Sequence, residues 1–343
     1  MTENRTIYKI DKMPLYQSKL YDSYSEAINS PLIDIRLQFD LTTGLVSNSA
    51  FDYEKIIYDQ DYNNDQSCSF VFLKHLDNVC DIILNNMPDR KYVEIGCGQG
   101  VFLEKIEKNQ KEIVGFDPSY KGWKKNIEKQ YFETENQHNT CNFIMRHVLE
   151  HIPNPIKFLE KLYNCCPDGI IYLEVPSLEW VIENNAWFDI TGEHCNYFTV
   201  DYFKNIFSDI KFIGKTFGGQ YISLIASLKS LHQKKYSGFE ISFPSDFGPP
   251  KSFSNFENDV YIWGAAGKGV IFSNYASRNG LGIKGLIDIN KDKVGKRISG
   301  TGHLIHDPES VLSKPGETVV LLNNNYFSEI KELCGDKAQI VCM

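Results

Sequence analysis

The sequence predicts an α/β protein with a Rossmann-like domain at its centre, a small N-terminal domain and a second, smaller α/β domain at the C-terminus. Two observations support this fold class. Strand-like and helical apolar segments alternate along most of the chain, which is typical of a mainly parallel sheet with helices on both faces. In addition, a strand followed by a glycine-rich turn and a helix occurs twice, at 91–108 and at 260–277. The length of 343 residues suits two or three domains better than a single core.

The individual elements follow from the spacing of apolar residues. Apolar side chains from Phe70 to Ile82 recur at helical spacing, and Pro88 ends that helix. Further strands are expected at 91–95, 112–116, 141–145, 169–175, 260–263, 283–287 and 318–322. Further helices are expected at 101–108, 121–130, 155–163, 267–277 and 327–334.

Composition divides the chain into parts. Residues 1–64 are rich in Tyr, Asp and Asn with short apolar runs, so we expect a small irregular arm or domain there. Residues 65–228 carry the first α/β series. A polar stretch at 229–258 has the composition of a linker, and 259–343 form the C-terminal α/β domain.

Charge and hydropathy exclude several classes of function. The net charge is −8 and no Lys/Arg-rich run is present, whereas nucleic-acid binding requires a basic surface. No apolar stretch reaches the roughly 18 residues of a membrane span. Residues 1–12 lack the apolar core of a secretory signal. The nine cysteines are scattered without a C-x-x-C pair, so we expect reduced thiols in a cytoplasmic protein.

The first glycine turn has the pattern of a site for a nucleotide-like cofactor. Gly96, Gly98 and Gly100 follow a strand and let the backbone approach a ligand, and the next helix offers unpaired amides. Asp117 ends the following strand, where an acid accepts hydrogen bonds from ribose hydroxyls. Glu94, just before the first glycine, is hard to explain in a dehydrogenase and is common in methyltransferases.

Seven motifs together resemble one family. They are Glu-Ile-Gly-Cys-Gly-Gln-Gly (94–100), Gly-Phe-Asp-Pro (115–118), Arg-His-Val-Leu-Glu-His-Ile (146–152), Leu-Glu-Val-Pro-Ser (173–177), Glu-His-Cys-Asn-Tyr-Phe (193–198), Trp-Gly-Ala-Ala-Gly-Lys-Gly (263–269) and Gly-Thr-Gly-His (300–303). The earlier motifs resemble class I S-adenosylmethionine-dependent methyltransferases. With the later ones, the chain resembles the three-domain C-methyltransferases of nucleotide-linked deoxysugars from about Phe51 onward.

The resemblance implies S-adenosylmethionine as the methyl donor and a small nucleotide-sugar as the acceptor. The glycine turn, Glu94 and Asp117 would hold the donor. In the family the Leu-Glu-His segment closes the loop after the fourth strand near the donor, which places Arg146 and His147 at the same site.

That segment also matches a zinc motif from which we expect no bound metal. His147 to His151 have the pattern H-x-x-E-H, which binds zinc on a helix in inverzincins. Here a strand precedes the pattern, and Pro153 and Pro155 follow it, so a long helix around both histidines is not expected. We expect His151 to be a partly buried structural histidine.

The resemblance places the catalytic groups in the Glu-His-Cys-Asn-Tyr-Phe segment. Its histidine, here His194, lies by the transferred methyl group in the family and acts as a base, with Glu193 beside it. A neutral histidine suits the removal of a proton next to a ketone, and Tyr197 could donate a hydrogen bond to the enolate. Thr191 stands where the family often has another tyrosine, and Tyr62 matches an active-site tyrosine of the family's N-terminal arm.

The family's N-terminal domain usually binds zinc through cysteine pairs, and this chain departs from that pattern. Asp40 and Thr43 stand where C-x-x-C would precede Gly44, so a four-cysteine zinc site cannot form. We expect packing to hold the arm instead. The residues concerned alternate as in a strand: Ile33, Ile35, Leu37 and Phe39.

The second glycine turn differs from both common nucleotide motifs. It lacks the P-loop pattern, and Ala266 stands at the second glycine of G-x-G-x-x-G. Because Asp288 ends the next strand, an NAD-dependent oxidoreductase stays open as a weak alternative. In the resembled family this half lines the sugar-nucleotide cleft, although a purely structural lobe is also compatible with the sequence. The candidates for acceptor binding are Gly267, Lys268, Asn324 and Tyr326.

Three alternatives to carbon methylation follow from the sequence. An O- or N-methyltransferase acting on a sugar or another surface-glycan precursor would carry the same donor motifs, and the missing zinc cysteines allow a changed acceptor. An oxidoreductase would use the second glycine turn, and a binding protein would keep the donor fold without turnover. Glu94 with Glu193 and His194 favours a methyltransferase. The sequence does not identify the acceptor sugar, its nucleotide or the oligomeric state.

Overall fold

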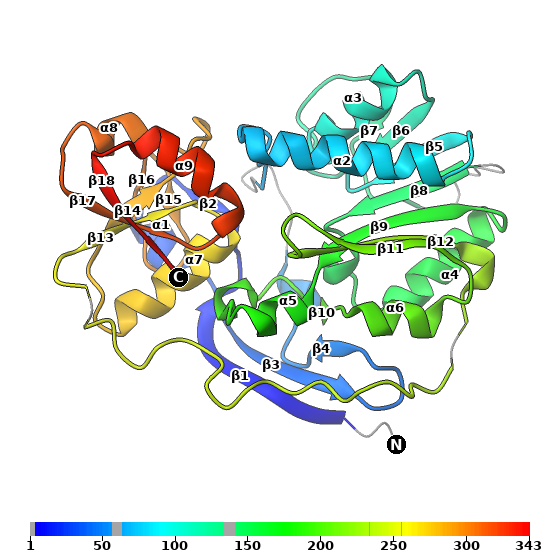
Figure 1. Cartoon of the computed structure of the whole chain (residues 1–343), viewed down its shortest axis with the longest axis horizontal. Helices are drawn as coiled ribbons and strands as arrows, with labels where there is room; N and C mark the ends of the chain where they lie inside the picture. The colour runs from blue at the N-terminus through cyan, green and yellow to red at the C-terminus, as the bar shows by residue number, and fades with distance from the viewer. Residues whose placement is uncertain (1–3, 57–63, 134–140, 233, 255) are drawn as a thin grey trace.

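The computed structural model describes residues 4–56, 64–133, 141–232, 234–254 and 256–343, which form three parts (Figure 1). The largest part is a seven-stranded sheet between two layers of helices. A five-stranded parallel sheet forms the C-terminal part, and the four-stranded sheet of the N-terminal arm lies below both in the view of Figure 1. None of the described helices is both long and apolar enough to cross a membrane.

The seven-stranded sheet has the strand order β11-β12-β9-β8-β5-β6-β7. Its strands are β5 (Lys91–Ile95), β6 (Ile113–Phe116), β7 (Ile127–Glu128), β8 (Cys141–Arg146), β9 (Ile170–Pro176), β11 (Ile210–Thr216) and β12 (Tyr221–Ser227). Strands β5 to β9 are parallel, whereas β12 is antiparallel to both β9 and β11. This doubly wound sheet confirms the predicted Rossmann-like fold. The winding direction reverses between β5 and β8, so a ligand site is expected at their carboxyl ends.

Helices cover both faces of this sheet. One face carries α2 (Phe70–Asn86) and α3 (Val101–Lys108), and the other carries α4 (Pro155–Cys165) and α6 (Val200–Ile206). Within β8, Ile144 packs in the cluster of α2 and α3, whereas Phe143 and Met145 pack in the cluster of α4 and α6. A strand buried on both faces explains why the sequence shows an unbroken apolar run here.

The helix predicted at 121–130 is wrong. The segment forms turns and the short strand β7, in which Ile127 is 7% exposed and pairs beside β6. A side chain also competes with helical bonding, because the Tyr120 hydroxyl accepts a hydrogen bond from the Lys124 amide at 2.8 Å. Edge pairing and local side-chain bonds therefore outweigh the helical spacing of this segment.

The N-terminal arm forms an antiparallel sheet that includes a strand from the predicted catalytic segment. Its order is β1 (Asn4–Pro14), β3 (Leu32–Asp40), β4 (Val46–Asn48) and β10 (Asn196–Tyr197). As predicted, β3 packs its alternate side chains inward, with Ile35, Leu37 and Phe39 fully buried. Because β10 lies between His194 and Phe198, the arm directly positions the candidate catalytic residues.

Asp40 stabilises the turn where the resembled family carries zinc cysteines. Its carboxylate accepts hydrogen bonds from the Thr42 amide at 2.7 Å and from the Thr43 hydroxyl at 3.0 Å. Tyr236 covers the same turn so closely that a Cβ added to Gly44 would lie 2.3 Å from its ring. Hydrogen bonds and aromatic packing thus hold this part of the arm.

The linker packs along the arm sheet. Between η4 (Leu228–Ser230) and β13 (Val260–Trp263), the described residues form no helix or strand and run along the arm in Figure 1. The Phe243 ring stacks on Tyr8 at 5.1 Å, and Phe247 meets Tyr8 edge to face at 5.4 Å. These aromatic contacts give a polar segment a fixed path over the arm.

The C-terminal part is a parallel sheet of order β16-β14-β13-β17-β18. Its elements are β13, α7 (Gly267–Arg278), β14 (Ile283–Ile287), β16 (Ile305–His306), α8 (Pro308–Leu312), β17 (Glu317–Leu321), α9 (Phe327–Cys334) and β18 (Ala338–Cys342). The winding reverses between β13 and β17, which creates a second expected ligand position.

The remaining elements are β2 (Leu20–Tyr21), α1 (Tyr24–Ile28), η1 (Tyr53–Lys55), η2 (Leu149–His151), α5 (Leu178–Glu183), η3 (Trp187–Asp189), β15 (Arg297–Ile298) and η5 (Asn324–Tyr326).

Candidate active site

Two adjoining cavities lie at the switch points of the two parallel sheets. The large cavity, of about 970 Å³, lies at the carboxyl ends of β5, β6 and β8. The small cavity, of about 210 Å³, lies at the carboxyl ends of β13, β14 and β17. Both are lined by Asn64, Asp65, Gln66, His147 and His151, so the two cavities meet at these residues.

The predicted glycine turn forms one wall of the large cavity. Gly96, Gly98 and Gly100 all have positive φ angles, of 72°, 55° and 82°. A Cβ would lie 2.3 Å from Val148 if added to Gly96 and 2.5 Å from Ile127 if added to Gly100, whereas none of the described atoms lies within 4 Å at Gly98. Gly98 therefore offers its backbone to a ligand. Gly96 and Gly100 are glycines because a side chain at either position would clash with the protein.

Asp117 holds this turn and also borders the cavity. Its Oδ2 accepts a hydrogen bond from the Gly98 amide at 2.8 Å, and its Oδ1 accepts from the Ser119 amide at 2.8 Å and hydroxyl at 2.6 Å. A carboxylate has about four acceptor positions, so capacity for a ligand hydroxyl is left. Helix α3 starts after Gly100 without a side-chain cap, which adds amide donors beside it.

Glu94 is a buried acid on the wall of the large cavity. It is 2% exposed, and its Oε2 has no hydrogen-bond partner among the described residues. Burial raises the pKa of Glu94 to about 8, against the opposing effect of the Arg146 charge. An unsatisfied acceptor at this position suits a cationic ligand that donates hydrogen bonds.

Arg146 and His147 border the large cavity and share a buried carboxylate, Glu174. Arg146 donates to Glu174 Oε1 from Nε at 3.0 Å and from its terminal nitrogen at 2.8 Å, and His147 Nε2 lies 3.3 Å from the same oxygen. Burial disfavours the charged form of His147, but the Glu150 and Glu174 carboxylates outweigh burial and raise the pKa of His147 to about 9. Both predicted donor residues are thus cations compensated from within the protein.

A main-chain contact brings two distant motifs together. The Cys195 amide donates to the Glu150 carbonyl at 2.9 Å, which joins the loop after β8 to the segment that contains β10. As a result, the His151 and His194 rings lie edge to face with centroids 4.9 Å apart. Both rings line the small cavity, and His151 also lines the large one.

His194 is buried but reaches the wall of the small cavity. It is 8% exposed, and burial lowers its pKa to about 3, so the ring is neutral near pH 7. A neutral imidazole carries one ring nitrogen that can accept a proton. The nearby Glu150 carboxylate favours the charged ring that results.

Glu193 connects the arm to both histidines. Its Oε1 accepts a hydrogen bond from the Gln17 amide at 2.7 Å, and its side chain is fully buried. Its carbonyl oxygen accepts a hydrogen bond from His151 Nδ1 at 3.0 Å. These contacts favour a positioning role for Glu193 over a chemical one.

Tyr197 is not placed for the hydrogen bond that the sequence suggested. Its hydroxyl donates to the Thr191 carbonyl at 3.0 Å and accepts from the Thr191 amide at 3.1 Å. The described residues that line the two cavities do not include Tyr197. The loop before β10 folds back on the ring, so Tyr197 stabilises that loop. Tyr62 lies outside the described residues.

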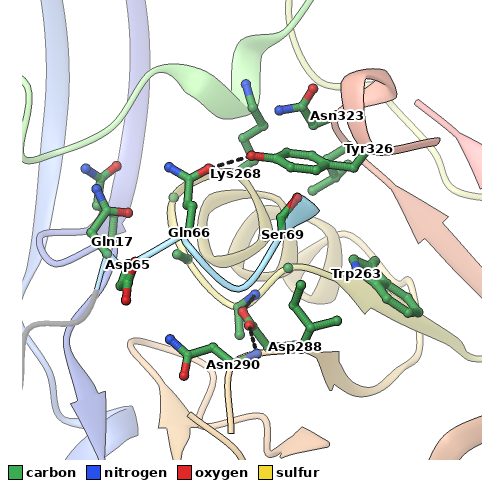
Figure 2. Close-up of a pocket in the computed structure, with 18 of the residues that line it drawn as sticks. Gln17, Asp65, Gln66, Ser69, Trp263, Lys268, Asp288, Asn290, Asn323 and Tyr326 are labelled. Carbon is green, nitrogen blue, oxygen red and sulfur yellow. Dashed lines mark hydrogen bonds between the residues drawn. The ribbon is translucent and has the colours of Figure 1, made fainter. Parts of the chain in front are cut away.

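Three of the four predicted acceptor-binding residues line the small cavity, namely Gly267, Lys268 and Tyr326. The fourth, Asn324, is exposed at the start of η5, and Asn323 lines the cavity instead (Figure 2). The reason is the turn after β17: Asn323 caps η5 by accepting from the Asn325 amide, which directs Asn324 to solvent.

Lys268 is held in place by side chains of the central part. It forms an ion pair with Asp189, and its ammonium lies 4.9 Å from the centre of the Trp180 ring. Burial lowers the pKa of Lys268. Asp189 also lines the small cavity, so this ion pair joins the central and C-terminal parts at the site.

Asp288 accepts a backbone hydrogen bond from the second glycine turn, as Asp117 does from the first. It accepts hydrogen bonds from the Ala265 and Asn290 amides, both at 2.9 Å, and pairs with Lys293 at 3.2 Å. It is only 7% exposed. A buried, ion-paired acid is poorly placed to bind ribose hydroxyls, which disfavours an NAD site here.

The sequence reasoning missed residues that join the parts of the protein at the site. The Gln66 side chain accepts a hydrogen bond from the Tyr326 hydroxyl at 2.7 Å (Figure 2). The Gln17 carbonyl accepts one from the Gly267 amide at 2.9 Å. Neither glutamine belongs to a recognisable motif, nor does Asp189, so the sequence carries no local signal for any of them.

Comparison with known families decides the class of the protein. A family profile described as a methyltransferase domain matches residues 70–212, from α2 to the start of β11, and so includes the turn, Asp117 and Glu94. The chain is an S-adenosylmethionine-dependent methyltransferase. A second profile, described as a C-methyltransferase C-terminal domain, matches residues 251–339 of the methyltransferase and covers four strands of its C-terminal sheet and the start of β18.

Solved structures resemble part of this methyltransferase. The SAM-dependent methyltransferase of Archaeoglobus fulgidus is 17% identical, with 46% of this chain and 100% of that chain covered and a TM-score of 0.33. A SAM-dependent methyltransferase of Thermotoga maritima is 15% identical, with 46% and 92% covered and a TM-score of 0.36. The plantazolicin methyltransferase BpumL is 21% identical, with 35% and 52% covered and a TM-score of 0.28, so the match spans about half of that protein. No curated protein sequence matches the chain.

S-adenosylmethionine fits the residues of the large cavity. The space beside Gly98 lets a ligand approach its backbone closely. Asp117 has capacity to accept from a ribose hydroxyl, and the unsatisfied Glu94 oxygen suits the positive charges of the donor. When bound, S-adenosylmethionine supplies an electrophilic methyl group on a positively charged sulfur. Gly98, Asp117 and Glu94 would hold the donor.

Donor binding by the methyltransferase is expected to release a proton. With a pKa of about 8, Glu94 is mostly protonated at pH 7 in the free enzyme. A cationic donor favours the ionised carboxylate, so binding lowers this pKa, expels the proton and strengthens as the pH rises to about 8. The gain should approach tenfold per pH unit between about pH 6 and pH 8. Calorimetry in buffers of different ionisation enthalpy measures the released proton.

The Glu94→Gln variant is the matched control for this effect. It keeps the shape of the side chain but has no proton to release, so its donor affinity should be lower and nearly independent of pH in this window. An unchanged pH dependence in Glu94→Gln would contradict the assignment of the proton to Glu94.

Proposed function

We propose that the methyltransferase transfers the methyl group to a carbon atom of a nucleotide-linked keto-deoxysugar in the small cavity, with His194 as the general base. The observation that carries this proposal is the position of His194 and His151 on the wall of the small cavity where it meets the large one. The description of the second family profile supports carbon as the acceptor atom.

The C-terminal sheet supports an acceptor that carries phosphate groups. Helix α7 is 12 residues long, begins at the small cavity and has no side-chain cap at its N-terminus. Such a helix end favours an anion through its dipole, although the Gly267 amide itself is bonded to the Gln17 carbonyl. Lys268 and Lys293 also line this cavity, where they are paired with Asp189 and Asp288. A diphosphate at this end of the cavity would leave the sugar towards His194.

The chemistry follows from the protonation state of His194. Methylation of carbon requires a carbanion equivalent, which forms when a proton is removed beside a ketone. The neutral ring of His194 accepts that proton on a nitrogen atom; burial and the neighbouring His151 disfavour the charged ring that results, and the Glu150 carboxylate opposes them. The carbon then attacks the methyl group from the small cavity.

Hydrogen exchange tests the proposal directly. In deuterated water, the enzyme should exchange the proton beside the ketone of a matching nucleoside-diphosphate keto-deoxysugar, and His194→Ala should not. With a ¹³C-methyl donor, nuclear magnetic resonance should place the new methyl group on carbon. A methyl ether or methylamine formed in a His194-dependent reaction would leave the base assignment in place and replace carbon methylation with O- or N-methylation. Carbon methylation that is independent of His194 would refute the base.

A further inference from the structure

Glu150, His151 and His194 form a cluster of metal-ligating groups at the small cavity. One ligand atom from each residue lies within 4.8 Å of the other two, and all three residues line the cavity. The H-x-x-E-H motif, from which no bound metal was expected, would have used His147 with His151. The structure shows that η2 is a single short turn and that His194, from a distant segment, completes the cluster.

The state of Glu150 independently indicates a ligand. Glu150 is 1% exposed, and neither of its carboxylate oxygens has a hydrogen-bond partner in the described part of the chain. The Nδ1 atom of His147 lies 3.6 Å from Oε1, which is too long for a hydrogen bond. The charged His147 ring compensates Glu150 from one side at 3.6 Å, but neither carboxylate oxygen is hydrogen-bonded to it, so the buried carboxylate keeps the capacity to bind a further cation.

His151 is oriented as metal-binding histidines are. Its Nδ1–H donates to the Glu193 carbonyl at 3.0 Å, so in the neutral ring the lone pair lies on Nε2. Metal ligands typically have such a partner on the other ring nitrogen, which fixes the tautomer and the ring plane. Glu193 is itself fixed, because its carboxylate accepts a hydrogen bond from the Gln17 amide.

We propose that Glu150, His151 and His194 bind one divalent transition-metal ion, such as Zn²⁺, and that the bound ion inhibits methyl transfer. Two imidazole nitrogens and one carboxylate oxygen form a known zinc ligand set, which leaves a coordination position open. Here that position would face the small cavity. Bond lengths of about 2.1 Å require ligand atoms about 3.4 Å apart, so the side chains must close by roughly an ångström.

Inhibition is expected because His194 would serve both as the general base and as a metal ligand. A ring nitrogen that donates its lone pair to a metal ion can no longer accept a proton. The inhibitory part of the proposal therefore rests on the proposed role of His194 as the base. The binding part does not, because it depends only on the three ligands.

Cobalt binding tests the site without any need for turnover. The full-length protein, stripped with a chelator, should bind one Co²⁺ with the visible absorption of a low-coordinate ion, and Zn²⁺ should displace it. Glu150→Gln and His194→Ala should each weaken Co²⁺ binding by more than about tenfold, since losing even an outer-shell partner costs this much. His147→Gln, which removes the other histidine of the sequence motif, and His232→Ala should keep the site. Circular dichroism and thermal unfolding show that each variant is folded.

The outcomes separate the two parts of the proposal. Unchanged Co²⁺ binding in Glu150→Gln and His194→Ala, or a loss of binding in His147→Gln alone, would overturn the site. One equivalent of Zn²⁺ should lower kcat and a chelator should restore it. A rise in kcat with Zn²⁺ would overturn inhibition. Because the Co²⁺ spectrum requires no acceptor, the site stands or fails separately from carbon methylation.

Discussion

Replacement of His194 by alanine is expected to slow methyl transfer by about 10²- to 10⁴-fold, the usual contribution of a general base. His194 lines the small cavity as a neutral ring, and its nearest aromatic neighbour, His151, donates Nδ1–H to the Glu193 carbonyl. Donor affinity should be preserved, because the glycine turn and Asp117 line the other cavity. Single-turnover assays with a labelled donor and calorimetry with S-adenosylhomocysteine measure the two quantities.

His232→Ala is the control for this prediction. His232 follows η4 and lies outside the described linings of both cavities, with its Nδ1 bonded to the Ser230 carbonyl at 2.9 Å. Its removal should change neither turnover nor donor affinity. Full activity in His194→Ala would show that the base lies elsewhere. A parallel loss of donor binding would show that His194 supports the fold rather than the chemistry.

The Asp117→Ala variant should bind the donor about 10- to 150-fold more weakly. Hydrogen bonds to a charged group contribute about 1.5–3 kcal/mol, which corresponds to this range. Two effects act in the same direction. The variant loses the acceptor for ribose hydroxyls, and it releases the Gly98 amide that Asp117 now holds at 2.8 Å. Calorimetry with S-adenosylmethionine or its demethylated product gives the change in Kd.

The equivalent acid of the second glycine turn provides the comparison. Asp288→Ala removes the acceptor of the Ala265 amide beside the small cavity and should leave donor affinity nearly unchanged. Weaker donor binding in Asp288→Ala but not in Asp117→Ala would contradict the assignment of the large cavity to the donor. Tight binding of NAD without binding of S-adenosylmethionine would contradict it as well.

The donor side of the site could be predicted because it is local in sequence. Gly96, Gly98 and Gly100 belong to one strand-turn-helix unit, and Asp117 ends the next strand of the same sheet. Hydrogen bonds within such a unit are determined by neighbouring residues, so the pattern alone indicates where Glu94 and Asp117 lie. The structure places Glu94, Gly96, Gly98 and Asp117 on the wall of the large cavity, with Gly100 buried behind it.

The errors arose where a local pattern competed with a longer-range contact. Helical spacing at 121–130 gave way to pairing beside β6. Asn324 was displaced from the small cavity by the cap that Asn323 makes on η5. Tyr197 had a chemically reasonable role, but its hydroxyl is bonded to the Thr191 backbone. In each case a hydrogen bond that the sequence does not specify decided the outcome.

By itself, the sequence determined the fold class, the glycine turn and the residue types of the candidate catalytic segment, because these depend on periodicity and on motifs within single units. The tertiary structure alone decided which groups meet at the small cavity. His151 and His194 come together through a contact between separate segments, and Glu193 is held by Gln17, 176 positions away in the chain. The grouping of Glu150 with both histidines likewise depends on how the arm and the central sheet pack. Burial and long-range hydrogen bonding, unlike strand or helix periodicity, leave no regular pattern in the sequence.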